Sequence, residues 1–141
     1  MGGIKSERLL DFSLPAEPVS CARARHAIRA ALQGAAVDVA AVELAVSEAV
    51  SNVVLHAYRE RDAATAEPSL HVRLTEDAEG VWILVSDDGA GMSAHRDSPG
   101  LGVGLSLMAK VSDQLLIVQG ETGTRVHMRF SFVDARAGNA R

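Results

Sequence analysis

Three polar side chains, Glu48, Asn52 and His56, recur at intervals of four residues within an apolar stretch. Residues four apart lie on the same face of a helix, so this spacing predicts one polar stripe. A carboxamide oxygen is a hard ligand for Mg²⁺, and a neighbouring carboxylate can polarise an attacking hydroxyl or water. The stripe therefore suits nucleotide chemistry, although the solvated face of an amphipathic helix shows the same spacing more often.

A first glycine-rich segment, Asp87-Asp88-Gly89-Ala90-Gly91, directly follows an apolar run. Glycines let the backbone turn sharply and approach a flat ligand, and an acidic side chain there can accept a hydrogen bond from an exocyclic amine. A turn that merely ends a strand has the same Asp-Gly composition, so both interpretations remain open at this point.

A second glycine-rich segment opens a predicted helix and consists of Gly100, Leu101, Gly102, Val103, Gly104 and Leu105. Exposed backbone amides at a helix N-terminus bind phosphate, whereas glycines that allow close helix packing are an equally good explanation. The segment is not a Rossmann fingerprint, because a polar loop rather than a strand precedes it. It also lacks the Gly-Lys-Ser/Thr of a Walker loop.

Hydrophobic periodicity predicts the elements that position these segments. Apolar residues three to four apart indicate helices, which are expected over residues 20–33, 37–58 and 101–111. Alternating or short apolar runs between turns indicate strands, which are expected over residues 8–14, 70–76, 81–85, 115–118 and 125–133. We expect Ser20 to cap the first helix and Gly34 to end it.

The order of these elements predicts an α+β fold. Helices that do not alternate with parallel strands indicate a two-layer sandwich, in which a mixed, mainly antiparallel sheet carries the helices on one face. We expect one domain over residues 8–134, with flexible ends at residues 1–7 and 135–141.

Composition excludes several classes of protein. The chain has 141 residues, 48% of them hydrophobic, which suits one folded domain rather than a disordered chain. A net charge of -4 argues against direct nucleic-acid or anionic-membrane partners. Cys21 is the single cysteine, so an internal disulfide or a thiolate zinc site is excluded. Without a signal peptide or a long apolar run, we expect a cytoplasmic protein.

Taken together, the motifs resemble those of the GHKL ATP-binding superfamily, and within it the small anti-sigma-factor serine kinases of bacteria. Residues 48–57 resemble that family's N-box, and Asp87-x-Gly89-x-Gly91 resembles its first glycine box. Residues 102–105 resemble the second glycine box, and Gly123-Thr124 is similar to the closing Gly-Thr.

The resemblance implies ATP and Mg²⁺ as cofactors and a role for each matching residue. Asn52 would coordinate Mg²⁺, and Glu48 would act as the base that activates a serine hydroxyl. Asp87 would accept a hydrogen bond from the adenine amine, with Thr124 beside it through water. The other residues expected to contact the nucleotide are Gly89, Gly91, Leu101, Gly102, Val103, Gly104 and Leu105.

The resemblance also implies that the protein sequesters a sigma factor and phosphorylates a serine of an anti-anti-sigma protein of the STAS type. The family commonly dimerises through its sheet edge, so a homodimer is expected. The loop from Met92 to Leu101 is shorter than the lid of the family's kinases, and the basic residue before the second glycine box is absent, with Arg96 or Lys110 as possible substitutes. The alternatives are a nucleotide-binding sequestration module without kinase activity and a detached histidine-kinase catalytic domain.

Overall fold

A single five-stranded sheet organises residues 6–57, 67–89 and 101–133, which are the residues that the computed structural model describes. The strands lie in the order β1-β2-β3-β5-β4, and each neighbouring pair is antiparallel. The strands are β1 (Glu7–Pro15), β2 (Ser69–Glu76), β3 (Gly80–Asp87), β4 (Gln114–Gly120) and β5 (Gly123–Ser131). The helical elements are α1 (Val19–Ala31), α2 (Val39–Asn52), the π-helical turn η1 (Val53–Ala57) and α3 (Leu101–Val111).

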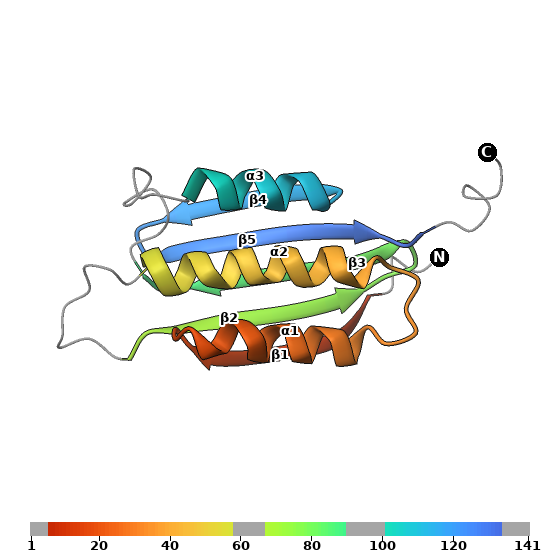
Figure 1. Ribbon diagram of the computed structural model, residues 1–141, viewed down its shortest axis with the longest axis horizontal. Helices are drawn as coiled ribbons and strands as arrows, with labels where there is room; N and C mark the ends of the chain where they lie inside the picture. The colour runs from red at the N-terminus through yellow and green to blue at the C-terminus, as the bar shows by residue number, and fades with distance from the viewer. Residues whose placement is uncertain (1–5, 58–66, 90–100, 134–141) are drawn as a thin grey trace.

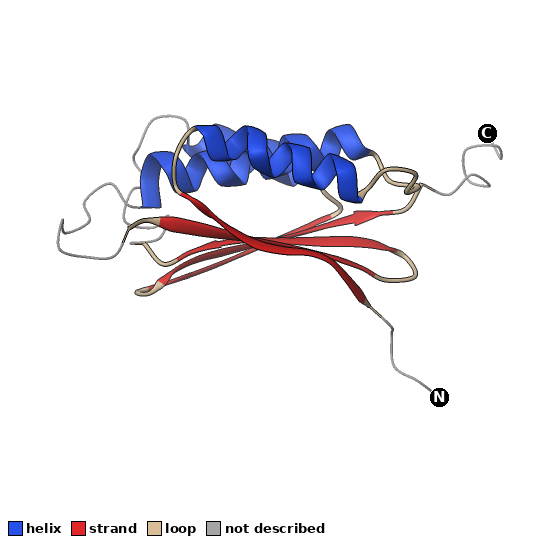
Figure 2. Cartoon of the chain, turned by 90° about the horizontal axis from the view of Figure 1, so that it is seen from below, coloured by secondary structure: helices blue, strands red, loops and turns tan. Residues whose placement is uncertain are grey.

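The helices cover one face of the sheet and leave the other face bare (Figure 2). Alternation along the strands explains this arrangement, because Val72 and Leu74 are fully buried while Arg73 between them points away from the helices. The core therefore lies between the two layers, and the predicted α+β sandwich is confirmed.

The first helix begins differently from the prediction. Pro18 occupies the N-cap position of α1 with φ -54°, and no side chain caps the helix. Ser20, the predicted cap, is buried, and its Oγ donates a hydrogen bond of 2.5 Å to the carbonyl oxygen of Pro15. Because proline is preset to the helical φ, the helix starts before the serine, which instead ties α1 to β1.

The predicted long helix divides into two parts. Its cap is Asp38, whose Oδ1 accepts a hydrogen bond of 3.1 Å from the amide of Ala41. Regular α-helix ends at Asn52, and η1 follows directly. The sequence predicted uninterrupted α-helix here, so the change to π-helical geometry is a correction; its position beside a polar residue is typical of π-bulges at functional sites.

The segment Val39–Ala57 is also long and apolar enough, with a mean hydropathy of 1.4, to cross a membrane by length and composition alone. Several of its apolar side chains, among them Val42, Val46 and Val50, are fully buried inside the protein, whereas Leu44 and Leu55 are exposed. Packing against the sheet therefore accounts for much of its hydropathy.

Several predictions concern residues outside the described ranges. They include Tyr58, Gly91, the lid residues 92–100 and the chain ends beyond residues 6 and 133.

The cap of α2 makes a stability prediction. We expect Asp38→Ala to lower the free energy of unfolding by about 1 kcal/mol, because the first-turn amide of Ala41 loses its acceptor. Asp38→Asn keeps an acceptor and should unfold close to the wild type. Urea denaturation followed by circular dichroism measures both, and equal stability of the alanine and asparagine variants would contradict the assigned cap.

Candidate functional site

Four elements meet at one end of the molecule, on the left of Figure 1. They are the end of α2 with η1, the end of β3, the start of α3 and the start of β5. Three glycines, Gly89, Gly104 and Gly123, make the close approaches that bring these elements together. This end therefore gathers the polar stripe with residues 87–89 and 101–105, the described parts of the two glycine-rich segments.

Gly104 of α3 lies against the polar stripe of α2. A β-carbon at this position would lie 3.2 Å from Oε2 of Glu48 and 3.4 Å from Oδ1 of Asn52. The first distance is tighter than ordinary van der Waals contact and the second lies at its lower limit, so the absence of a side chain leaves room for the carboxylate and the carboxamide. The structure thus brings Gly104, a predicted site residue of α3, against two predicted site residues of α2 that lie far from it in the chain.

Asn52 carries an unpaired polar group inside the protein. Its side chain is 7% exposed, and Nδ2 makes no hydrogen bond within the part of the chain that the structure describes. Buried amides are nearly always paired, so an unpaired one indicates a missing partner. An asparagine amide has an oxygen that can ligate Mg²⁺ and an NH₂ group that can donate to a phosphate oxygen. The site therefore fits a metal-bound nucleotide.

The turn after Asn52 brings a second polar residue inside. His56 lies in η1 and is buried, as is Ala57. A β-carbon at Gly89 would clash with the carbonyl oxygen of Ala57, so the first glycine-rich segment packs directly on the end of η1. The helix and the end of β3 are in backbone contact here.

Asp87 ends β3 with its side chain only 8% exposed. Burial raises the pKa of this carboxyl group, and the negative charge of Asp88 raises it further. Hydrogen bonds from the backbone of Gly89, at 2.8 Å, and of Thr124 oppose the pKa shift. A buried carboxylate held in this way can accept a hydrogen bond from a ligand amine.

Thr124 lies directly opposite Asp87 on β5 and is also buried. The preceding residue, Gly123, has φ +130°, and a β-carbon there would clash with the carbonyl oxygen of Asp87. Only glycine suits this position. The predicted pair of Asp87 and Thr124 is therefore adjacent in space.

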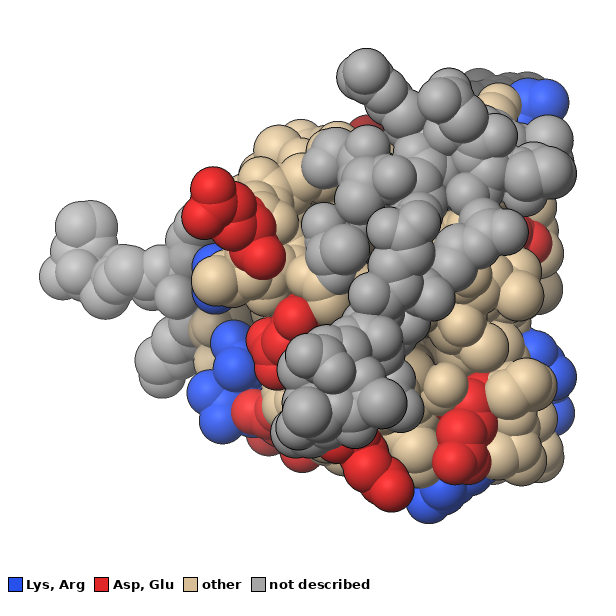
Figure 3. All heavy atoms as spheres, turned by 90° about the vertical axis from the view of Figure 1, so that its left-hand side faces the viewer, with Lys and Arg blue, Asp and Glu red and all other residues tan. Residues whose placement is uncertain are grey.

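The first turn of α3 supplies backbone amides to the same end. Leu101, Gly102, Val103 and Gly104 begin this helix, and the first four amides of a helix have no partner within it. Leu105 follows and is half-buried. Acidic side chains lie around this end in Figure 3, with basic side chains among them. A divalent cation would offset the repulsion between the acidic side chains and an anionic ligand.

The sequence did not single out a pocket of about 270 Å³ beside Asp87. Ser86, Thr122 and Arg125 line it together with Asp87 and Gly123. Ser86 precedes Asp87 on β3, and Arg125 follows Thr124 on β5. Because side chains alternate between the two faces of a strand, the sequence could have predicted that Ser86 and Arg125 lie on the opposite face of the sheet at this end.

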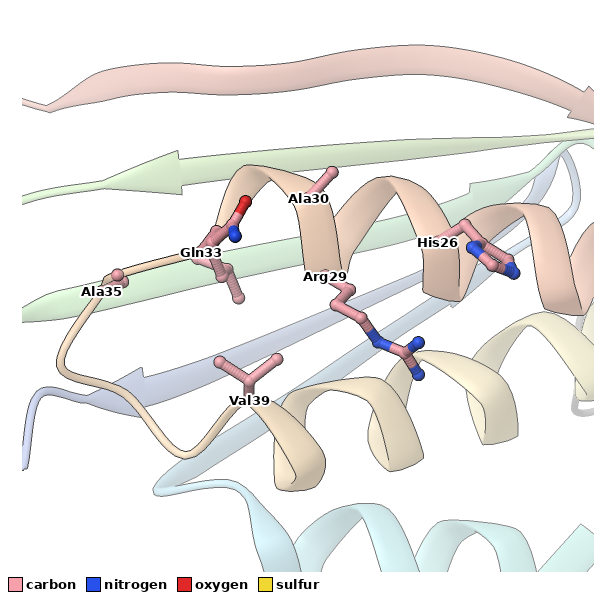
Figure 4. Close-up of a pocket in the computed structure, with 8 residues that line it drawn as sticks. His26, Arg29, Ala30, Gln33, Ala35 and Val39 are labelled. Atoms are coloured by element: carbon pink, nitrogen blue, oxygen red, sulfur yellow. The ribbon is translucent and has the colours of Figure 1, made fainter.

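Another pocket, of about 380 Å³, lies beside the end of α1 and the start of α2 (Figure 4). Arg29 lines this pocket, and its guanidinium Nη2 is ion-paired with Oε1 of Glu43 at 2.7 Å. None of the predicted site residues lines this pocket. The chemistry-bearing residues are thus at the other end of α2.

The fold and site define a class of protein. A sequence profile of the histidine kinase-like ATPase domain matches residues 14–130. The chain therefore belongs to this family, whose domain implies ATP binding. No curated protein gives a significant match to the chain.

Solved structures share the fold. A structure of the RsbU and RsbW domains of Rv1364c from Mycobacterium tuberculosis has 23% sequence identity and a TM-score of 0.61, with 89% of this chain and 34% of that chain covered. The histidine kinase domain of a blue-light activated histidine kinase from Erythrobacter litoralis EL346 has 22% identity and a TM-score of 0.57, with coverages of 84% and 62%. This chain therefore spans about a third of the first structure and less than two thirds of the second.

Gly104 provides a test of the site geometry. We expect Gly104→Ala to weaken ATP binding about tenfold or more, because the new methyl group displaces Glu48 or Asn52. The fold should persist, since alanine favours helix over glycine. Calorimetric titration with ATP measures the affinity, and Ser106→Ala on an exposed position of the same helix is the matched control. Wild-type affinity in Gly104→Ala would contradict the close approach.

Asp87 provides a test of the buried charge. Because burial raises the folded-state pKa of Asp87, folding favours its neutral carboxyl group. The contribution of that group to the free energy of unfolding is lost as pH rises through the raised pKa. Asp87→Asn removes the charge and should raise the melting temperature at pH about 7, with a difference that shrinks as pH falls toward about 3.9. It should also abolish ATP binding.

The exposed neighbour supplies the control for Asp87. Asp88→Asn changes the same charge at an exposed position, so its melting temperature should stay near that of the wild type. Thermal unfolding over a pH series compares the two variants. A lower melting temperature for Asp87→Asn at neutral pH would show that hydrogen bonding, not burial of charge, dominates at this position.

Proposed function

We propose that this protein is an ATP- and Mg²⁺-dependent anti-sigma regulator that sequesters a sigma factor and phosphorylates a serine of an anti-anti-sigma protein of the STAS type. One observation carries the proposal: the buried amide of Asn52, which has no hydrogen-bond partner within the described ranges, lies beside Glu48, where Gly104 of α3 leaves room for both. The motif resemblance and the fold shared with a structure that contains an RsbW domain support it.

Each residue of the site has a binding role in this proposal. The oxygen of Asn52 holds Mg²⁺, and the first-turn amides of α3 hold phosphate oxygens. Asp87 accepts a hydrogen bond from the adenine amine, with Thr124 beside it. The metal, when bound, neutralises charge on the phosphates.

Glu48 is the residue that we assign to the transfer step. Its carboxylate takes the proton of the incoming serine hydroxyl. The hydroxyl oxygen forms a bond to the γ-phosphorus of ATP while the bond from that phosphorus to the bridging oxygen breaks. The bridging oxygen keeps the electron pair, so the products are phosphoserine and ADP. Positioning and charge stabilisation suffice for this chemistry.

Partners and location follow from the same proposal. A protein that holds a sigma factor away from RNA polymerase acts in the cytoplasm, and it needs neither direct nucleic-acid contact nor a membrane. We also propose that it forms a homodimer.

Two substitutions separate binding from transfer. Asn52→Ala should abolish Mg²⁺-dependent ATP binding, whereas Glu48→Gln should keep binding and reduce phosphate transfer by about 10²- to 10⁴-fold. Calorimetry measures binding, and transfer of radiolabel to a purified STAS-type antagonist measures activity. Glu43→Gln, on the same helix but paired with Arg29, is the matched control and should behave as the wild type in both assays.

The label also distinguishes the alternatives. Acid-stable label on serine supports the proposed kinase, whereas acid-labile label indicates phosphohistidine and a detached histidine-kinase catalytic domain. ATP binding without any transfer of phosphate would instead support a nucleotide-binding sequestration module without kinase activity. Full activity of Glu48→Gln would refute the assigned base.

A further inference from the structure

The bare face of the sheet differs in charge from the protein as a whole. The chain carries 14 lysine and arginine residues against 18 aspartate and glutamate residues. On β2, β3, β4 and β5, by contrast, the side chains that alternate onto the bare face include no carboxylate. The basic residues among them are His71, Arg73, Arg125, His127 and Arg129. An acidic protein thus presents a basic surface on the side that the helices leave bare (Figure 2).

The arginines of this face differ in how their charges are balanced. Nη1 of Arg129 lies 3.6 Å from Oδ2 of Asp77, and its Nη2 lies 3.2 Å from Oε2 of Glu79. Arg73 forms an ion pair with an aspartate of the edge strand β1. Arg125 is exposed and forms no ion pair with any residue that the structure describes. The uncompensated positive charge of the face therefore lies at Arg125, beside β4.

Aliphatic side chains lie directly beside this charge. Val118 of β4 is opposite Arg125 of β5, and Leu116 is opposite His127. Val118 is 47% exposed and Leu116 is 59% exposed. Leu84 of β3 lies on the other side of His127 and is half-buried. These five residues, which we call the bare-face patch, place exposed aliphatic groups next to basic ones.

Two hollows adjoin the bare-face patch. Leu84 and His127 line one of about 200 Å³, together with the ring of Trp82. Val118 and Arg125 line the other, of about 270 Å³. The surface is therefore uneven, and it offers recesses for side chains of a bound protein.

We propose that the bare-face patch binds an acidic amphipathic helix of a partner protein, which adds a third layer to the sandwich. The aliphatic side chains of that helix pack on Leu116 and Val118. Its carboxylates lie against Arg125 and His127, where a basic surface attracts them. Charge complementarity selects the partner, and the exposed aliphatic groups supply the apolar area that is removed from water.

The dimensions of a helix suit the bare-face patch. Leu116 and Val118 are two residues apart on a strand, which corresponds to about 7 Å. Side chains four residues apart on a helix are separated by about 6 Å along its axis, so one apolar stripe can contact both. A helix is about 10 Å wide and strands are about 5 Å apart, so a helix above β4 also covers β5. Its apolar stripe then lies on the aliphatic residues of β4 and its acidic flank on the basic residues of β5.

Other occupants fit the bare-face patch less well. A second copy of this chain packed through the same patch would bring the basic residues of two copies together. A nucleic acid would bind through its phosphates and leave Leu116 and Val118 without an apolar partner. The five residues of the patch lie outside the nucleotide site, so the proposed docking holds or fails independently of the proposed kinase activity.

Two matched synthetic helices test the charge preference. The probe is a fluorescein-labelled peptide of about 18 residues, made of leucine, alanine and glutamate, with leucines three and four residues apart. The matched peptide has lysine in place of every glutamate. Fluorescence anisotropy with the full chain should show micromolar binding of the acidic peptide and at least about tenfold weaker binding of the basic one. Absence of binding by the acidic peptide at about 100 μM protein, or equal binding of both peptides, would overturn the proposal.

Substitutions on the two faces of the molecule test the location. Arg125→Glu should weaken binding of the acidic peptide about tenfold or more and strengthen binding of the basic one. Arg23→Glu makes the same change at an exposed position of α1 and should leave both affinities unchanged. Leu116→Ser should also weaken binding, whereas Leu44→Ser, at an exposed leucine of α2, should not. Equal effects of the patch variants and their controls would contradict the assigned surface.

Two further measurements on the wild type distinguish this docking from its alternatives. Nuclear magnetic resonance with the acidic peptide should shift amide signals of β4 and β5 and spare those of α1 and α2. Shifts concentrated in the helices would place the binding surface elsewhere and overturn the assignment. Labelled duplex DNA should not bind under the same conditions. DNA binding that Arg125→Glu abolishes would assign the patch to nucleic acid instead.

Discussion

The site depends on three places where a glycine lets the backbone come close to a neighbouring element. Gly104 lies against Glu48 and Asn52, Gly89 against the end of η1, and Gly123 against the backbone of Asp87. These contacts join both layers of the sandwich at one end. Without them, the polar groups of α2, β3 and α3 would lie on separate elements with side chains between them, and no common site would exist.

The same end concentrates the polar groups that burial disfavours. The Asn52 amide has no hydrogen-bond partner among the residues that the structure describes, and burial raises the pKa of Asp87, whereas most of the interior consists of apolar side chains from the helices and the strands. A core of valine, leucine and isoleucine offsets the cost of these groups. Such a separation of a stable apolar core from a polar site is typical of proteins whose binding site lowers the stability of the fold until ligand binds.

Periodicity predicted most of the fold. The limits of α3 are those predicted, and each predicted strand lies within an observed one except at the end of β5, where Val133 lies beyond Ser131. Hydrophobic spacing could not show the π-helical turn, because its five residues are too few to reveal a change of period. Nor could spacing place Gly104 beside Asn52, since that contact depends on how distant helices pack. The motif resemblance identified these residues, and the packing of α3 against α2 brings them together in space.

The bare face of the sheet has a practical consequence. Trp82, the chain's one tryptophan, lies on β3 with the guanidinium of Arg129 at 5.4 Å from its ring centre. It is five residues along the strand from Asp87, which corresponds to about 16 Å. The protein thus contains an intrinsic fluorophore whose emission reports on whatever covers this face of the sheet, with little sensitivity to the nucleotide end. Binding to this face can therefore be followed by tryptophan emission without an added dye, whether or not nucleotide is bound.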